Sequence, residues 1–294
     1  MFEKRSSIIW ICLLLCLLMA GCRERMELDE GNAVYYWRTD LRLDSTERAF
    51  LKAYHINKVY CRYFDVVMDE NGEPMPNATI TFSDTLPAGI EIIPTVYITI
   101  DCLQKPHKGL AEKLVKRIRQ MNETNDISGV REIQIDHDYT ARNMKVYYDF
   151  LKEVRGVWRE ECGGRLLSTT IRLHQLSMEA PPVDYGALMI YNTGDPQKFT
   201  ERNPILDQRD VAPYLRHLDD YPLPLAAAYP VFSWLRIISG VEIEHTVEAS
   251  EILQVKRIME QERKDLSRSV ITYHLDKENI NRYKPETYEE IYHH

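Results

Sequence analysis

Three polar residues alternate with apolar ones in one short segment of the chain. Gln134, Asp136 and Asp138 are separated by single residues within the stretch EIQIDHDYT at 132–140. Successive side chains of a β-strand point to opposite faces, so these three groups are expected on one face and the two isoleucines on the other. Two carboxylates about 7 Å apart on an enclosed face repel each other, which raises one pKa and gives a proton donor beside an ionised partner. Asp136 and Asp138 are therefore candidate catalytic residues for acid–base cleavage of a glycosidic bond.

The same two acids have a structural alternative. Asp138 would then cap the following helix, and Asp136 would take part in a salt bridge. His137 lies on the opposite face of the strand, so a metal site built from it and the two acids would need both faces at once. We therefore expect neither a metal centre nor a cofactor.

Further residues are candidates for holding a substrate. Arg62 is a cation inside an apolar run, where it would pair with Asp136 or Asp138, or bind substrate. In the run at 166–173 and just after it, Arg172 and His174 are expected on the inward face. Aromatic rings near strand ends suit stacking on the apolar faces of sugar rings, with ordinary packing as the alternative. The candidate substrate-binding set is Gln134, Arg62, Tyr191, His174, Arg172, Trp37 and Trp234.

These residues need a scaffold that brings separate segments together, and the chain carries a regular series of short apolar runs. Such runs are typical of buried parallel strands, and their starts are separated by roughly 20 to 45 residues, the spacing of β-α units. Amphipathic helices are expected between several of them, with stripes at 110–121, 144–154 and 247–266 and with Ser45 as the N-cap of an earlier helix. The expected strands are 33–37, 58–64, 91–98, 131–138, 166–173, 187–191, 225–229 and 269–274.

Eight strands with helical crossovers predict an α/β fold, a single (β/α)8 TIM-type barrel over residues 33–294. In such a barrel the active-site residues lie at the carboxyl ends of the strands, where Asp136 and Asp138 would stand. The segments 70–90 and 192–223 show no helical pattern, so some helices are expected to be irregular or missing. A small hairpin suits 70–90, and a long loop suits 192–223. An open doubly wound sheet is the alternative fold.

The amino-terminal end has the features of an export signal. Lys4 and Arg5 precede thirteen apolar residues at 8–20, too few to span about 30 Å of hydrocarbon as a helix. Small residues then lead into Cys22, as in the lipobox of bacterial lipoproteins. This predicts a signal peptide at 1–21, palmitate-type acylation of Cys22 and a charged tether at 22–32. A plain secretory signal or a short uncleaved anchor is the alternative. We expect a lipid-anchored protein of the bacterial cell envelope, in the outer membrane, with the leaflet left open.

The composition narrows the possible partners. Lys and Arg number 37 against 45 Asp and Glu, a net charge of −8, and no basic block stands out, so a nucleic-acid partner is not expected. Once the three amino-terminal cysteines are set aside, Cys61, Cys102 and Cys162 allow at most one disulfide. Disulfides are therefore not expected to hold the fold. The sequence identifies no protein partner.

Several of these segments together resemble an uncharacterised family of bacterial exported barrel proteins that are related in shape to glycoside hydrolases. The resemblance spans roughly residues 33–275 and implies the barrel, but no established activity. It is carried by RYFDV at 62–66, EIIPTVYI at 91–98, QIDHD at 134–138, STTI at 168–171, MIYNTGD at 189–195 and AAAYPVFSW at 226–234.

A looser resemblance is to chitinase-like retaining glycosidases, whose fourth strand ends in D-x-D-x-E and whose sixth carries M-x-Y followed by Asp. Gln134, Asp136 and Asp138 stand at the D, D and E positions; the M-x-Y motif is present as Met189 and Tyr191, with Asn in place of the Asp. The resemblance implies that Asp138 takes the place of the general acid, with a side chain one methylene shorter.

We therefore expect a glycoside-hydrolase-like lipoprotein that acts on or binds carbohydrate in the cell envelope or outside the cell. Asp138 is the expected proton donor, and Asp136 is expected to orient groups and stabilise charge. The alternatives are a non-catalytic glycan-binding lipoprotein with a degenerate site, and a scaffold lipoprotein that presents surface loops.

Overall fold

The computed structural model describes residues 28, 30–163, 166–195, 202–238 and 241–293. The predicted signal peptide at 1–21, Cys22 and most of the predicted tether at 22–32 lie outside these residues. Within the described part of the chain, no helix combines the length and the apolar character that crossing a membrane demands.

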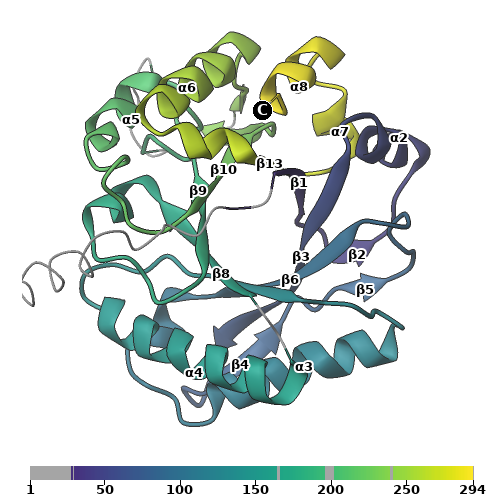
Figure 1. Cartoon of the computed structure of the whole chain (residues 1–294), viewed down its shortest axis with the longest axis vertical. Helices are drawn as coiled ribbons and strands as arrows, with labels where there is room; N and C mark the ends of the chain where they lie inside the picture. Colours follow the sequence, from purple (N-terminus) through teal and green to yellow (C-terminus); the bar gives the residue numbers. More distant parts are fainter. Residues whose placement is uncertain (1–27, 29, 164–165, 196–201, 239–240, 294) are drawn as a thin grey trace, which may run out of the picture.

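Eight parallel strands close into a barrel (Figure 1). β1 (Gly31–Tyr36) closes the ring because it pairs with β13 (Ser269–Tyr273) on one side and with β3 (Ile56–Met68) on the other. Each of the eight predicted runs contributes one strand, so the (β/α)8 prediction is confirmed and the open sheet is excluded. The other barrel strands are β6 (Glu91–Ile98), β7 (Glu132–Asp136), β8 (Leu166–Arg172), β9 (Tyr185–Met189) and β10 (Leu225–Pro230).

Helices surround the strands in the ring that Figure 1 shows. α3 and α4 pack side by side on one flank of the barrel, and α6 contacts both α5 and α8. A short hairpin, β11 (Trp234–Ile238) with β12 (Val241–His245), follows β10. The helices of the described residues are α2 (Ser45–Ala53), α3 (Leu110–Thr124), α4 (Met144–Cys162), α5 (Gln208–Leu215), α6 (Ala249–Glu262), α7 (Lys277–Ile280) and α8 (Pro285–Ile291), with 3-10 turns η1 (Ile100–Leu103), η2 (Leu173–Ser177) and η3 (Lys264–Arg268).

Two crossovers of the described barrel lack an α-helix, as the sequence indicates for 70–90. Between β3 and β6, β4 (Pro74–Asn77) pairs antiparallel with the end of β3, and β5 (Thr81–Phe82) pairs with β2 (Asp40–Leu41). The small hairpin expected within 70–90 is therefore shared with the extended β3. Between β8 and β9 the described chain forms only the 3-10 turn η2.

Two details of the helix prediction are wrong. Asp44, not Ser45, is the N-cap of α2: its side chain accepts from the amide of Glu47 at 2.9 Å, and the Glu47 carboxylate accepts from the amide of Asp44 at 2.9 Å. A carboxylate at the positive end of a helix makes a strong cap. The second detail is α5, which lies inside 192–223, where a loop is expected. The sequence does not predict this helix because Pro213 within it interrupts the helical pattern.

The alternation predicted for β7 is observed. The Tyr35 hydroxyl on β1 donates to Oε1 of Gln134 on β7 at 2.8 Å, and these strands are not neighbours, so the bond crosses the barrel interior. Ile133 and Ile135 consequently face outward, fully buried under the helical layer. Burial of each such side chain contributes about 1.5–3 kcal/mol. Polar groups thus occupy the inside of this strand and apolar groups its outside.

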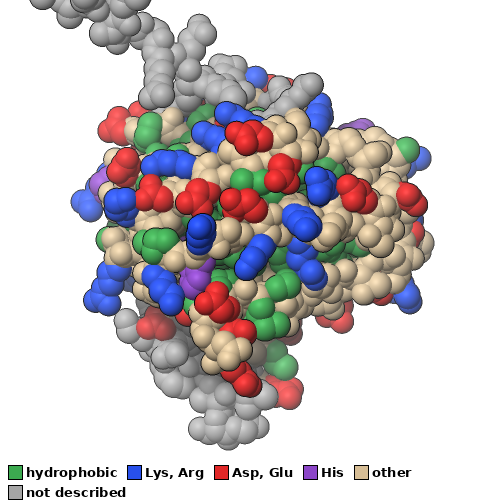
Figure 2. Space-filling view, turned by 90° about the horizontal axis from the view of Figure 1, so that it is seen from below, with side chains coloured by type: hydrophobic (Ala, Val, Ile, Leu, Met, Phe, Trp, Pro, Cys, Tyr) green, Lys and Arg blue, Asp and Glu red, His purple; other side chains and the backbone are tan. Residues whose placement is uncertain are grey.

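The surface carries charges of both signs. On the face shown in Figure 2, Lys and Arg side chains lie among Asp and Glu side chains, and neither sign forms a continuous block. Exposed ion pairs such as Lys145–Asp149, at 2.6 Å, are screened by solvent and contribute little to stability. Cys61, Cys102 and Cys162 are free thiols, and Cys61 is buried in the core on β3.

Candidate functional site

A cleft of about 550 Å³ opens at the carboxyl ends of the barrel strands, and both candidate catalytic acids line it. Asp136 is the last residue of β7, and Asp138 lies two residues beyond the strand. We call this space the mouth cleft. Its lining residues are Trp37, Arg62, Tyr97, Asp136, Asp138, Arg172, Tyr191, Asn192, Phe232, Ser233, Trp234, Tyr273, His274, Asp276, Glu278, Asn279 and Arg282.

Arg172, the last residue of β8, bridges the two acids. Its Nε donates to Oδ1 of Asp138 at 2.6 Å, and its Nη2 donates to Oδ1 of Asp136 at 3.2 Å. Thr170 on β8 also donates to Oδ1 of Asp136, at 2.6 Å. Because β7 and β8 pair in parallel register, these partners face the acids directly. One guanidinium therefore holds both carboxylates at the same end of the barrel.

The two acids differ in their access to solvent. The side chain of Asp136 is only 6% exposed, whereas the side chain of Asp138 is 39% exposed. Burial raises the pKa of Asp136, the positive charge of Arg172 opposes that shift, and the negative charge of Asp138 adds to it. The sequence predicts one raised pKa from repulsion between like charges; the raised group is Asp136, and the main cause is desolvation.

The structural alternative for the pair is half right. Asp136 does form a salt bridge, with Arg172. Asp138 does not cap the next helix, because the N-cap of α4 is Asn143. His137 faces outward as predicted: its Nδ1 donates to the carbonyl of Ile98 at 2.8 Å, and its Nε2 accepts from Nδ2 of Asn143 at 3.0 Å.

Arg62 lines the mouth cleft, but the prediction that it pairs with the catalytic acids is wrong. Its Nε donates to Oδ1 of Asp65 at 2.7 Å, and its Nη2 forms an ion pair with the other oxygen of that carboxylate. The register of β3 shifts between Arg62 and Phe64, which turns Arg62 toward its own strand. The guanidinium carbon also lies 5.5 Å from the centroid of the Trp37 ring.

Aromatic rings form a connected wall of the mouth cleft. The ring of Tyr273 lies at the centre, 5.8 Å from Trp37, 5.1 Å from Tyr191 and 5.5 Å from Phe232, measured between centroids. Phe232 in turn lies 6.2 Å from Trp234. Packed rings of this kind offer a rigid apolar surface with little conformational freedom to lose on binding.

Two predicted substrate-binding residues do not line the mouth cleft. Gln134 is fully buried below it, where it accepts from Tyr35 and its Nε2 donates to Ser168 at 3.4 Å. His174 is exposed on η2, because β8 ends at Arg172 and the 3-10 turn redirects the chain. The strand alternation on which the prediction of an inward-facing His174 depends therefore ends at Arg172, two residues before His174.

Sequence reasoning misses the wall contributed by α7 and the residues around it. Asp276 caps α7 by accepting from the amide of Asn279 at 2.8 Å, and its Oδ2 lies 3.4 Å from Nε2 of His274. The Asp-Lys-Glu-Asn stretch at 276–279 carries the N-cap signal that would have placed a helix directly after the last strand. Tyr97, which lies on β6, and the loop residues Ser233 and Arg282 have no comparable signal. Among the described residues, no group of three or more His, Cys, Asp or Glu side chains is arranged to hold a metal ion.

Comparison with known proteins identifies the fold. No protein-family model matches the chain, and no curated protein matches it. Many solved structures are similar, including the following three. A chitinase from Bacteroides thetaiotaomicron is 11% identical with a TM-score of 0.60, covering 90% of this chain and 97% of its own. The Bacillus cereus spore cortex-lytic enzyme SleL is 14% identical with a TM-score of 0.54, covering 90% and 74%. A family 18 N-acetylglucosaminidase from Paenibacillus barengoltzii is 9% identical with a TM-score of 0.53, covering 90% and 99%. The chain therefore has a TIM-type barrel of the shape found in these glycoside hydrolases, as the resemblance predicts.

Proposed function

We propose that this protein is a glycoside hydrolase whose mouth cleft binds and cleaves a carbohydrate chain. The observation that carries the proposal is the position of Asp136 and Asp138, which lie together in an open cleft with an aromatic wall. A pair of carboxyl groups and an apolar stacking surface are what hydrolysis of a glycosidic bond requires.

The roles of the two acids are assigned by exposure and not by pKa, because Asp136, the group with the raised pKa, is enclosed. Asp138 is the proton donor, because its half-exposed side chain reaches the space that a substrate would fill. Asp136 is enclosed and held by Thr170 and Arg172, which suits a group that orients the substrate and stabilises developing positive charge. Arg172 positions both acids.

The substrate class is a glycan that contains N-acetylglucosamine. Three proteins that share the barrel support this proposal through their descriptions as a chitinase, an N-acetylglucosaminidase and a spore cortex-lytic enzyme. The mouth cleft supplies aromatic faces for pyranose rings and tyrosine hydroxyls, from Tyr97 and Tyr273, for polar substituents.

Glycan binding without hydrolysis is the second candidate function. It is favoured by the contacts of Arg172, which donates to one oxygen of each acid. A proton donor needs a free path to the glycosidic oxygen, and the Asp138 side chain is both short and engaged by Arg172.

A panel of chitin, peptidoglycan and N-acetylchito-oligosaccharides separates these functions. Hydrolase activity predicts reducing-end release that falls at least about a hundredfold in Asp138→Asn, with saccharide binding retained. Saccharide binding with no product from the wild-type protein would establish the second candidate. If neither binding nor release occurs on any of these glycans, both proposals are wrong.

We also propose that the protein is a lipoprotein of the cell envelope, anchored through Cys22. The tether would join the barrel where β1 begins, at the amino ends of the strands, so the mouth cleft would lie at the end of the barrel remote from the membrane. Metabolic labelling with a palmitate analogue tests this: incorporation is expected in the wild-type protein and not in Cys22→Ser.

A further inference from the structure

A second hollow adjoins the mouth cleft at the same end of the barrel. It has a volume of about 710 Å³ and lies between the segment that follows β1, the start of α2 and the start of α7. We call it the side hollow. Its lining residues are Trp37, Arg38, Thr39, Asp40, Arg42, Leu43, Asp44, Glu47 and Lys277.

One aromatic ring belongs to both spaces. Trp37 lines the mouth cleft and the side hollow, and neighbouring residues of one short segment face different sides: Lys277 lines the side hollow, whereas Asp276 and Glu278 line the mouth cleft. Trp37 and the start of α7 therefore form a shared ridge.

Trp37 is held in place on that ridge. Its ring lies 5.9 Å from Tyr35 in an edge-to-face arrangement and 5.8 Å from Tyr273, and the Arg62 guanidinium lies 5.5 Å from its centroid. The indole keeps an exposed part, since it is only partly buried. One sugar ring can stack on such a fixed, half-exposed indole, and the sugar units linked to it would then lie in the hollows on its two sides.

Polar and charged side chains line the side hollow together with Trp37 and Leu43, and most of the charges are already paired. Arg38 forms an ion pair with Glu47 at 2.8 Å, and Arg42 lies 3.6 Å from Asp40. Such a lining offers hydrogen-bond donors and acceptors with little uncompensated charge, which suits hydroxyl-rich sugar units. Each hollow alone has the volume of a small-ligand site.

We propose that the substrate is an oligosaccharide chain that passes from Asp136 and Asp138 across Trp37 into the side hollow, so that recognition requires several linked sugar units. This inference rests on the proposed function, because it assigns the substrate length of the same site. Thr39 is exposed on the side hollow and is remote in sequence from the acids, so it is the position at which to close the hollow.

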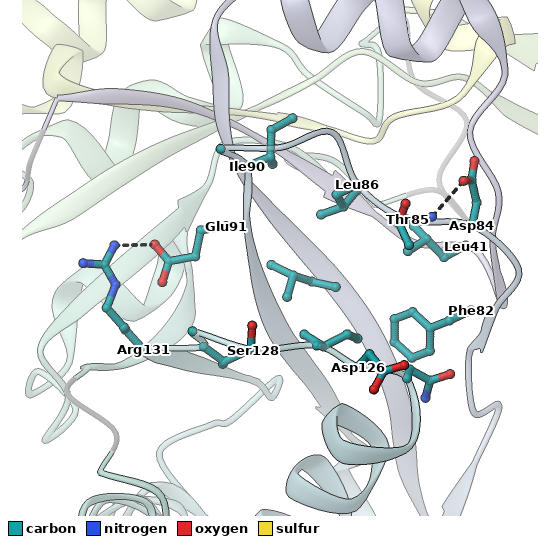
Figure 3. Close-up of a pocket in the computed structure, with 16 residues that line it drawn as sticks. Leu41, Phe82, Asp84, Thr85, Leu86, Ile90, Glu91, Asp126, Ser128 and Arg131 are labelled. Carbon is teal, nitrogen blue, oxygen red and sulfur yellow. Dashed lines mark hydrogen bonds and ion pairs between the residues drawn. The ribbon is translucent and has the colours of Figure 1, made fainter.

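A third hollow provides a matched control. Thr85 is exposed on this hollow, of about 590 Å³, which lies between the loops at 82–92 and 125–131 near the amino ends of β6 and β7 (Figure 3). Figure 3 shows Thr85 beside Asp84 on the rim of that hollow, across from Ser128 and Asp126. Thr85→Trp adds the same bulk as Thr39→Trp at a position that lines neither the mouth cleft nor the side hollow.

The test is calorimetric titration of the full chain with N-acetylchito-oligosaccharides of two to six units, in the wild-type protein and in the slow Asp138→Asn background. We expect affinity to rise with length, Thr39→Trp to weaken binding of the hexamer by about tenfold or more, and the dimer to change by less than about twofold. Thr85→Trp should leave the whole series unchanged. Thermal unfolding of both variants checks that they remain folded.

Two results would overturn the inference while leaving the proposed function intact. One is a wild-type affinity that does not depend on chain length. The other is an equal loss for all lengths in folded Thr39→Trp. Failure of every length to bind the wild-type protein is a different outcome, because it removes the proposed N-acetylglucosamine substrate itself.

Discussion

β7 carries a buried acid at each end of the barrel, and the two ends differ in what surrounds the acid. Glu132 begins the strand and Asp136 ends it, both on the inward face. Glu132 is 1% exposed and Asp136 is 4% exposed, and burial is the main cause of a raised pKa in both. By burial and electrostatics alone, the two residues look alike.

The surroundings separate them. Glu132 accepts from Oγ of Ser168 at 2.6 Å and from the hydroxyl of Tyr185, and Nζ of Lys58 lies 3.6 Å away. Those partners enclose the Glu132 carboxylate at the amino-terminal end of the barrel strands. Asp136 instead lies at the floor of the mouth cleft, beside the half-exposed Asp138. A raised pKa therefore marks a buried carboxyl group, and access to a cleft is what makes such a group a candidate for chemistry.

The largest effect is expected at the open end, from Arg172→Ala. Removal of this guanidinium leaves Asp136 enclosed without its counter-ion, beside a second negative charge, which should destabilise the fold by about 3 kcal/mol at neutral pH. Urea unfolding measures the change. Adding Asp136→Asn should restore much of the loss, because it removes the buried charge; a double variant no more stable than Arg172→Ala would contradict the bridge.

A smaller effect of opposite sign is expected at the closed end, from Glu132→Gln. The folded-state pKa of Glu132 lies above its unfolded value, so its contribution to stability is fully present below about pH 4 and is lost as pH rises through the folded pKa. Glutamine can still accept from Ser168 and carries no charge. The variant should therefore be more stable than wild type by about 1 kcal/mol at pH 7, with the difference disappearing toward pH 4.

Unfolding midpoints in urea from pH 4 to pH 8 check this prediction. A wild-type advantage at pH 7 would mean that Lys58 and the hydroxyl donors fully stabilise the ionised Glu132.

The smallest effect is expected from Lys58→Met. The ammonium is 29% exposed and lies 3.6 Å from Glu132, so its attraction is partly screened, and its loss should cost less than about 1 kcal/mol at pH 7. The same variant in a Glu132→Gln background should cost nothing measurable. An equal cost in both backgrounds would assign the role of Lys58 to packing.

The barrel and its acid pair could be predicted from the sequence because both follow a strand period of two. Gln134 and Asp136 alternate with Ile133 and Ile135 at that period, and each apolar run forms one strand. Prediction fails where the chain departs from a regular strand, either at its end or at a register shift within it. His174 turns away on η2, and Arg62 turns to Asp65 at a register shift that no residue pattern announces.

Much of the cleft wall was also beyond sequence reasoning. Ser233 and Arg282 come from loops whose paths depend on packing between distant segments; Arg282, for example, donates to Oγ of Ser233 at 2.7 Å. The sequence also mispredicts the cause of the raised pKa of Asp136, since the depth of this residue depends on the whole barrel and not on the spacing of two acids.

One measurement tests the central claim most directly: single-turnover cleavage of N-acetylchitohexaose by the wild-type protein, Asp138→Asn and Glu132→Gln, each shown to be folded. The account predicts that Asp138→Asn loses at least about a hundredfold in rate while Glu132→Gln cleaves at the wild-type rate. Equal rates for the wild-type protein and Asp138→Asn would contradict it, because the carboxyl group at the open end of β7 would then take no part in the reaction.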